Sequence, residues 1–152
     1  MKKIIIILLV FTIVLSITSC GADPSAESML SDFVVSYGAV GVIYSPRFSE
    51  GEPGYITDGL FSEIYIYDGT PPENYAIFLN SYADYGSECA VFVCSDEAEC
   101  ERVVEACRER TSLLGRGEGM LLLRSGYIVF YSTMTDAERA EAIWRKIIRE
   151  YT

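Results

Sequence analysis

The sequence predicts an α+β fold in which helices cover one face of an antiparallel four-stranded sheet. Two pairs of apolar, β-branched segments predict two β-hairpins, because a short turn-forming stretch separates the members of each pair. A segment with a capping residue and apolar side chains at helical spacing follows each hairpin. The order strand, strand, helix, strand, strand, helix is typical of α+β domains. An N-terminal amphipathic helix and a leader segment precede this pattern.

The first predicted helix lies directly after the leader. Asp23 can cap it, and Pro24 can occupy its first position, where a missing N–H costs nothing. Gly38 ends it. We expect its apolar face to pack on the core, although binding of a partner is an alternative. The residues of this face are Met29, Leu30, Phe33, Val34 and Tyr37.

The segment of residues 39–68 is ambiguous. Residues 40–44 fit either a short strand or a continued helix, and Pro46 ends either one. Residues 60–65 fit a helical turn, whereas residues 64–67 also fit a strand.

The third and fourth quarters of the chain are clearer. Residues 75–82 and 88–94 predict a hairpin, and Asp96 then caps a helix that has Glu99 three residues later. The apolar face of this helix comprises Cys100, Val103, Val104, Cys107, Thr111 and Leu114.

Residues 120–123 and 127–132, joined by residues 124–126, predict the second hairpin. Thr135 and Glu138 form a capping box for the final helix. One side of this helix carries Ala140, Ile143, Trp144, Ile147, Ile148 and Tyr151.

The first nineteen residues have the layout of a secretory signal peptide. Lys2 and Lys3 precede residues 4–15, in which only one residue is polar. Twelve helical residues span about 18 Å, less than the roughly 30 Å of a hydrocarbon core. We therefore expect residues 1–19 to be a cleaved signal, with an uncleaved membrane helix as the alternative.

Ile17, Thr18, Ser19 and Cys20 resemble the lipobox of bacterial lipoproteins, in which an apolar residue and two small ones precede the modified cysteine. The resemblance implies that Cys20 receives a lipid carrying fatty acids such as palmitate. It also implies that the domain is anchored at the extracytoplasmic face of the bacterial cell membrane, because two acyl chains hold a soluble domain on a bilayer. The alternative is a secreted protein in which Cys20 has no special role.

The remaining chain divides into a tether, residues 20–26, and a single domain, residues 27–152. Loss of Lys2 and Lys3 with the signal leaves 10 basic and 22 acidic residues, a net charge of −12. Such a surface repels nucleic acid and anionic headgroups. We therefore expect membrane contact through the lipid on Cys20 and no nucleic-acid partner, while a protein or glycan partner stays possible.

Four cysteines, Cys89, Cys94, Cys100 and Cys107, follow Cys20. The chain has no histidine and no Cys-x2-Cys pair, so we expect no zinc site. Cys100 and Cys107 are about two helical turns apart and cannot bridge each other. The open alternatives are buried free thiols or a strand-to-helix disulfide, either Cys94–Cys100 or Cys89–Cys107.

Few residues suggest catalysis. Without histidine there is no His-based triad, and a cysteine nucleophile lacks its usual base. Residues 115–119 have a G-x-G-x-G pattern, but they lead into a strand and not into a helix, which argues against a phosphate loop. We expect no catalytic residue, no cofactor and no metal. The main hypothesis is a non-enzymatic binding or scaffolding domain. The alternatives are an exported thiol or redox protein that uses the four cysteines and a hydrolase that uses a carboxylate pair.

Two tyrosines are candidates for a binding surface. If helices cover the face of Ile128 and Phe130, Tyr127 and Tyr131 emerge on the opposite face, where they could bind a glycan or a protein. The alternative, which we favour, is that residues 39–68 fold across that face.

The region 88–110 begins with a strand that contains Glu88, Val91 and Phe92, and an acidic helix then runs to Arg110. This arrangement resembles that of domain-of-unknown-function family 4358, which occurs in small lipoproteins of Firmicutes. Residues 126–129 are similar to the second hairpin of that family. The resemblance covers about residues 60–151. It implies a lipoprotein address and favours a helix at residues 60–65, and it implies no activity.

Overall fold

The computed structural model describes residues 25–81, 87–115 and 119–152. The predicted signal peptide, Cys20, and the expected cap at Asp23 and Pro24 lie outside these residues. Within them, one antiparallel sheet contains five strands in the order β1-β2-β3-β5-β4. The predicted α+β class is confirmed, but the predicted count of four strands is wrong because the ambiguous residues 41–44 supply an edge strand.

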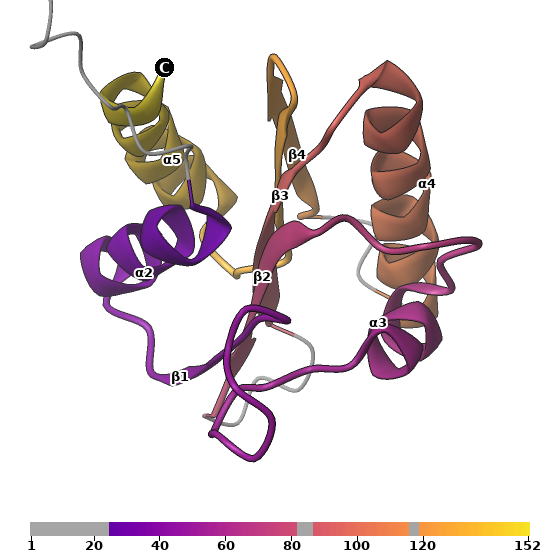
Figure 1. Cartoon of the computed structure of the whole chain (residues 1–152). Helices are drawn as coiled ribbons and strands as arrows, with labels where there is room; N and C mark the ends of the chain where they lie inside the picture. Colours follow the sequence, from indigo (N-terminus) through magenta and orange to yellow (C-terminus); the bar gives the residue numbers. More distant parts are fainter. Residues whose placement is uncertain (1–24, 82–86, 116–118) are drawn as a thin grey trace, which may run out of the picture.

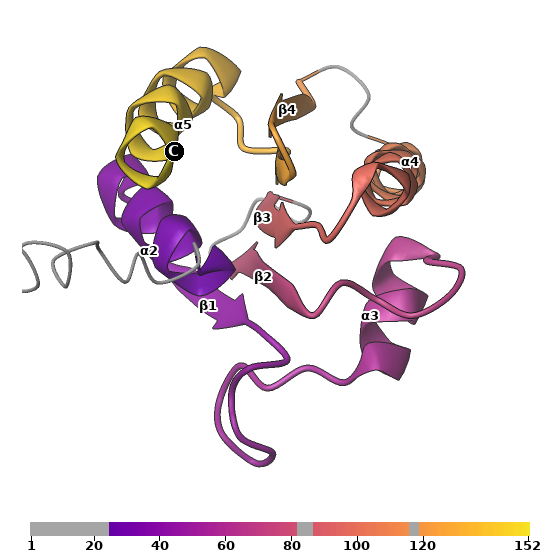
Figure 2. The same cartoon turned by 45° about the horizontal axis from the view of Figure 1, so that its top comes forward.

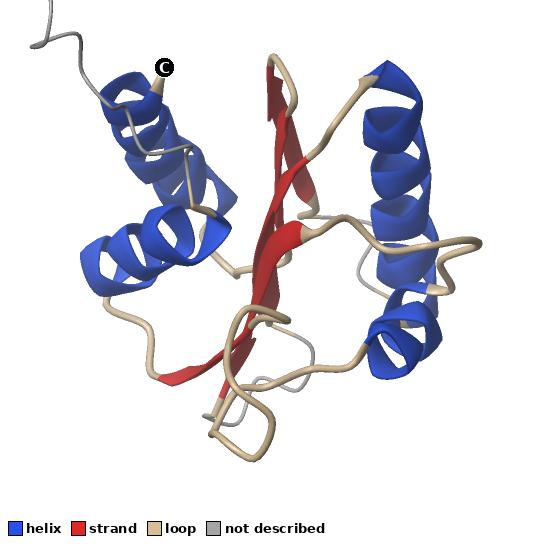
Figure 3. Cartoon of the chain, viewed as in Figure 1, coloured by secondary structure: helices blue, strands red, loops and turns tan. Residues whose placement is uncertain are grey.

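The five strands are short. β1 (Gly41–Tyr44), β2 (Asn74–Asn80) and β3 (Glu88–Val93) are followed by β4 (Leu121–Ser125) and β5 (Ile128–Ser132). Both predicted hairpins, β2–β3 and β4–β5, are confirmed (Figure 3). Ser125 pairs with Ile128, so the second hairpin turns at Gly126 and Tyr127. Gly126 has a positive φ of 58° in this turn, a conformation that glycine adopts without strain.

Helices cover both faces of the sheet. α2 (Ala26–Tyr37) and α5 (Ala137–Tyr151) lie on one face, and α3 (Asp58–Tyr65) and α4 (Glu97–Leu113) lie on the other (Figures 1 and 2). The prediction that the helices pack on one face is therefore wrong. The physical reason is visible in β5, in which every residue is buried, as in a strand that has a packed layer on each side.

The helix ends follow ordinary capping chemistry. Ser25 caps α2 by accepting a hydrogen bond from the Ser28 N–H, and Thr57 caps α3 in the same way through the Leu60 N–H. Gly38 ends α2 in the left-handed conformation, with φ 74°. The helix that the family resemblance favoured at residues 60–65 is present as α3.

The core between the sheet and α2/α5 contains stacked aromatic rings. The ring centroids of Phe130 and Trp144 are 4.3 Å apart with nearly parallel planes, and that of Phe33 is 4.8 Å from that of Phe130. Aromatic pairs of this kind contribute beyond the area that they bury. Through these contacts, the helices α2 and α5 pack as one layer against the central part of the sheet.

The core on the opposite face also depends on aromatic side chains. Phe61 and Tyr65 of α3 stack with their ring centroids 5.1 Å apart, and the ring centroid of Phe61 is 4.4 Å from that of Tyr75 in β2. Tyr65 meets Phe92 of β3 edge to face. α3 therefore covers this face, as we favoured for residues 39–68, whereas residues 41–44 of that segment belong to the sheet itself as the edge strand β1.

Replacing Phe130 by alanine should lower the free energy of unfolding by about 3–5 kcal/mol, because the side chain is fully buried between Phe33 and Trp144. Urea unfolding measures the loss. Leu113→Ala is the matched control, since its side chain is 63% exposed and its removal should change little. Equal losses for the two variants would contradict the described core.

Candidate functional site

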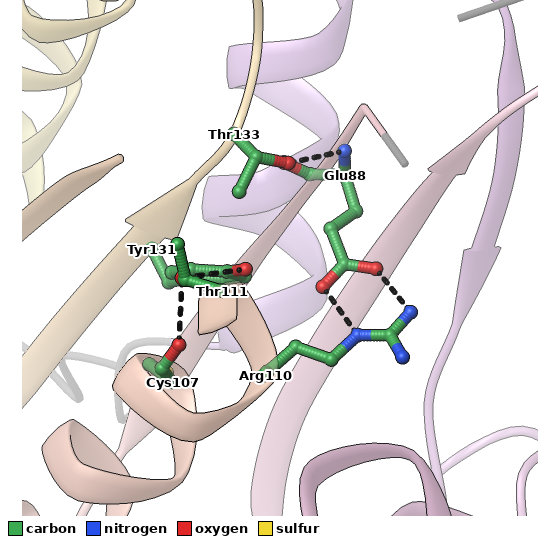
Figure 4. Close-up of polar contacts among 6 residues, drawn as sticks. All are labelled: Glu88, Cys107, Arg110, Thr111, Tyr131 and Thr133. Carbon is green, nitrogen blue, oxygen red and sulfur yellow. Dashed lines mark hydrogen bonds and ion pairs between the residues drawn. The ribbon is translucent and has the colours of Figure 1, made fainter. Parts of the chain in front are cut away.

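Two groups of polar side chains lie on the α3/α4 side of the sheet. The first surrounds Glu88, the first residue of β3, whose side chain is 1% exposed. Arg110 of α4 holds this carboxylate with two hydrogen bonds (Figure 4): Nε donates to Oε1 at 3.0 Å and Nη2 donates to Oε2 at 2.8 Å. The pair fixes the last turn of α4 to the start of β3.

The backbone of Glu88 is held as firmly as its side chain. Its N–H donates to the Thr133 hydroxyl at 3.1 Å (Figure 4). Its carbonyl accepts the Thr133 N–H at 2.9 Å. A buried charge costs stability unless its partners are in place. Arg110 is the partner of the Glu88 carboxylate, and Thr133 is the partner of its backbone N–H and carbonyl. The Glu88–Arg110 ion pair therefore has a structural role.

Tyr131 lies in the same region and is completely buried. Its hydroxyl is 3.2 Å from that of Thr111, which donates to the Cys107 carbonyl at 2.8 Å (Figure 4). Burial raises the pKa of Tyr131 far above its ordinary value, so the phenol stays neutral. Tyr127, in contrast, is 52% exposed at the hairpin turn. The hypothesis of a shared Tyr127/Tyr131 surface is wrong, because α3 and α4 cover the face onto which Tyr131 points.

The hydroxyls of Tyr65 and Tyr75 are buried, and neither has a hydrogen-bond partner among the residues that the structure describes. Burial raises the pKa of Tyr65, and the negative charge of Glu88 raises it further. The phenol is therefore neutral beside the ion pair. This arrangement keeps charge confined to Glu88 and Arg110.

The second polar group borders a cleft of about 740 Å³ between the end of β3, the residues 68–74 and the start of α4. Carboxylates of Asp68, Glu73 and Glu99 line it together with Arg102 and Cys94. Arg102 lies on the cleft wall with its Nε donating to the Tyr67 hydroxyl at 3.3 Å. The cleft thus combines charged groups with one sulfur.

The loop that enters α4 is held by two capping hydrogen bonds. Asp96 accepts the Glu99 N–H at 2.8 Å, and Glu99 accepts the Ser95 N–H at 2.6 Å. The predicted cap at Asp96 is confirmed, whereas Glu99 accepts the N–H of Ser95 and not the N–H of Asp96 that a capping box would require. The acidic groups of Asp96 and Glu99 therefore serve the helix N-terminus, where the helix dipole favours them.

All four cysteines of the described residues are free and buried. Cys89 packs in the α2/α5 core, whereas Cys94, Cys100 and Cys107 pack in the α3/α4 core. The alternative of a Cys89–Cys107 bridge is wrong, because these side chains lie on opposite faces of the sheet. The four-cysteine group considered for a redox role is thereby divided.

The side chains of Cys94 and Cys100 are neighbours in the α3/α4 core. Burial, and after it the neighbouring Cys100 thiol, raises the pKa of Cys94 well above its ordinary value, so the thiol is protonated at neutral pH. Burial likewise raises the pKa of Cys89 and that of Cys107. Of the bridges considered from the sequence, the structure brings together only Cys94 and Cys100.

Sequence reasoning identified the positions of Glu88 and Arg110 only through the family resemblance and did not predict their contact. An acidic residue that opens an otherwise apolar strand was the available signal, since such a residue needs a buried partner. Nothing comparable in the sequence pointed to Arg102, which lines the cleft, or to its hydrogen-bond partner Tyr67. Within the described ranges, no group of three or more potential metal-ligating side chains is placed to hold a metal ion.

No family model, curated protein or solved structure matches the chain. The resemblance to family 4358 therefore stays a prediction.

Replacing Arg110 by methionine should destabilise the protein by about 3–5 kcal/mol, because Glu88 would remain buried without its partner. The double variant Glu88→Leu/Arg110→Met should regain much of this loss, since it removes both charges. Urea unfolding of the single and double variants measures both effects.

The control for this pair is Arg108→Met, which removes an exposed partner of Glu105 on the same helix. It should leave stability unchanged within the precision of the measurement. A loss for Arg110→Met as small as that of the control would show that the Glu88 pair does not anchor α4.

Proposed function

We propose that the chain is a lipid-anchored extracytoplasmic domain with a non-enzymatic binding or scaffolding role. The observation that carries the proposal is the short distance in sequence between Cys20, the expected lipid acceptor, and Ala26, the first residue of α2. Ala26 is fully buried, and its N–H donates to the Asn74 side chain at 3.0 Å. The folded domain therefore begins six residues after Cys20.

Six extended residues reach about 20 Å. A domain that is anchored through Cys20 would therefore lie close to the bilayer surface. Its net charge of −12 after signal removal gives no electrostatic attraction to anionic headgroups, so the lipid would supply the membrane contact. As to the folded part itself, none of its described helices has the length and apolar character needed to cross a membrane.

The polar groups of the domain support a binding role over a catalytic one. Both carboxylate oxygens of Glu88 are occupied by Arg110, and the acids at the start of α4 serve as helix caps. Buried titratable groups are thus used to hold the fold. The cleft beside Cys94 offers room for part of a protein or glycan partner.

Radiolabelled palmitate should be incorporated into the unmutated chain in its bacterial host, and Cys20→Ala should abolish the label, because the sulfur of Cys20 is the proposed acceptor. Cys94→Ala is the matched control and should retain the label, since Cys94 lies inside the folded domain. An unmutated chain without label, or a Cys20→Ala chain with full label, would overturn the proposal.

A further inference from the structure

Cys94 and Cys100 form a pair of thiols at one edge of the α3/α4 core. Cys94 directly follows β3, and Cys100 lies in the first turns of α4. Both side chains belong to the same buried cluster, and the Cys100 thiol is close enough to Cys94 to raise its pKa. Five residues separate the two cysteines in sequence.

The segment between the two cysteines is fixed at several points. The Cys94 N–H donates to the Tyr127 carbonyl at 2.8 Å, and the Cys100 N–H donates to the Asp96 carbonyl at 3.1 Å. Ser95 is held by Glu99 through the capping bond described above. The backbone positions of Cys94 and Cys100 are therefore fixed relative to each other, and disulfide formation depends on such a fixed geometry.

The two thiols differ in their access to solvent. Cys94 is 5% exposed and lines the cleft of about 740 Å³, whereas Cys100 is fully buried. A small molecule that enters the cleft therefore meets Cys94 first. The cleft also has room for a group that is transiently attached to that sulfur.

We propose that Cys94 and Cys100 form a reversible disulfide by exchange with an external disulfide. The internal Cys94–Cys100 bond would hold the start of α4 against the end of β3. The proposed extracytoplasmic location makes such an oxidant available in the cell, because disulfides persist outside the cytoplasm. The pairing itself depends only on the folded domain. This inference goes beyond the proposed function in assigning a modification site.

The exchange proceeds in two steps. At mildly alkaline pH a small fraction of Cys94 is ionised in spite of its raised pKa. This thiolate attacks one sulfur of the external disulfide, which forms a mixed disulfide and releases one external thiolate. The Cys100 thiolate then attacks the sulfur of Cys94, which forms the internal bridge and releases the second external thiolate. The two protons lost by the cysteines are taken up by the two released thiolates. The external disulfide is reduced to two thiols as the cysteine pair is oxidised.

The test uses the full-length chain, extracted in detergent and equilibrated with oxidised glutathione under native conditions at mildly alkaline pH. After an acid quench and alkylation, digestion with a protease that cleaves after glutamate separates Cys94 from Cys100, because Glu97 and Glu99 lie between them. Mass spectrometry should then find the two peptides joined by a disulfide. The oxidised protein should also melt about 5 °C or more above the reduced protein.

Matched variants separate this bridge from other thiol chemistry. The double variant Cys89→Ala/Cys107→Ala should keep the bridge, and Cys94→Ala should lose it. Cys100→Ala should retain glutathione on Cys94, since the resolving thiol is absent. A bridge to Cys89 or Cys107, a bridge that forms only in urea, or an unbridged Cys94 and Cys100 in the folded protein would overturn the proposal. The palmitate experiment has no bearing on this outcome, so the two proposals can fail separately.

Discussion

The fold depends on the burial of β3 at the centre of the sheet, with a packed helical layer on each side. Its first residue is a carboxylate in a position where water cannot solvate it, so Glu88 must find its partner within the protein. Arg110 meets this requirement from the last turn of α4. One ion pair thereby determines where α4 lies along the sheet. The loop between β3 and α4 must close the remaining distance, and this loop forms one wall of the cleft.

α4 is therefore attached to the sheet at both of its ends. Its last turn is held by Glu88, and its first turns contact the end of β3 through Cys94 and Cys100. Arg124 of β4 adds ion pairs to Glu97 and Glu101 at the start of the helix. These exposed pairs contribute less than the buried one, because solvent screens them. The geometry that stabilises the fold is thus the same geometry that places Cys94 at the cleft and Cys100 behind it in the same core.

The sequence predicted the elements more reliably than their arrangement. Both hairpins, the helix cap at Asp96 and the apolar stripe of α5 were predicted correctly, because they depend on local periodicity and capping. The placement of α4 and α5 on opposite faces of the sheet was missed, since Tyr131 fits either an exposed or a buried position. The hydroxyl of Thr111, twenty residues away, makes the buried position favourable. The contact between Glu88 and Arg110 and the division of the cysteines between two cores likewise depend on tertiary packing, which a single sequence does not contain.

β3 is covered on both faces and should be the most protected element of the domain, which native-state hydrogen exchange can measure residue by residue. Ala90 and Phe92 of β3, paired with both neighbouring strands, should exchange only through global unfolding. Amides of the edge strands β1 and β4 should exchange at least about tenfold faster, because each edge strand has a single neighbour in the described sheet. Exchange of β3 at the rate of β1 would contradict the account.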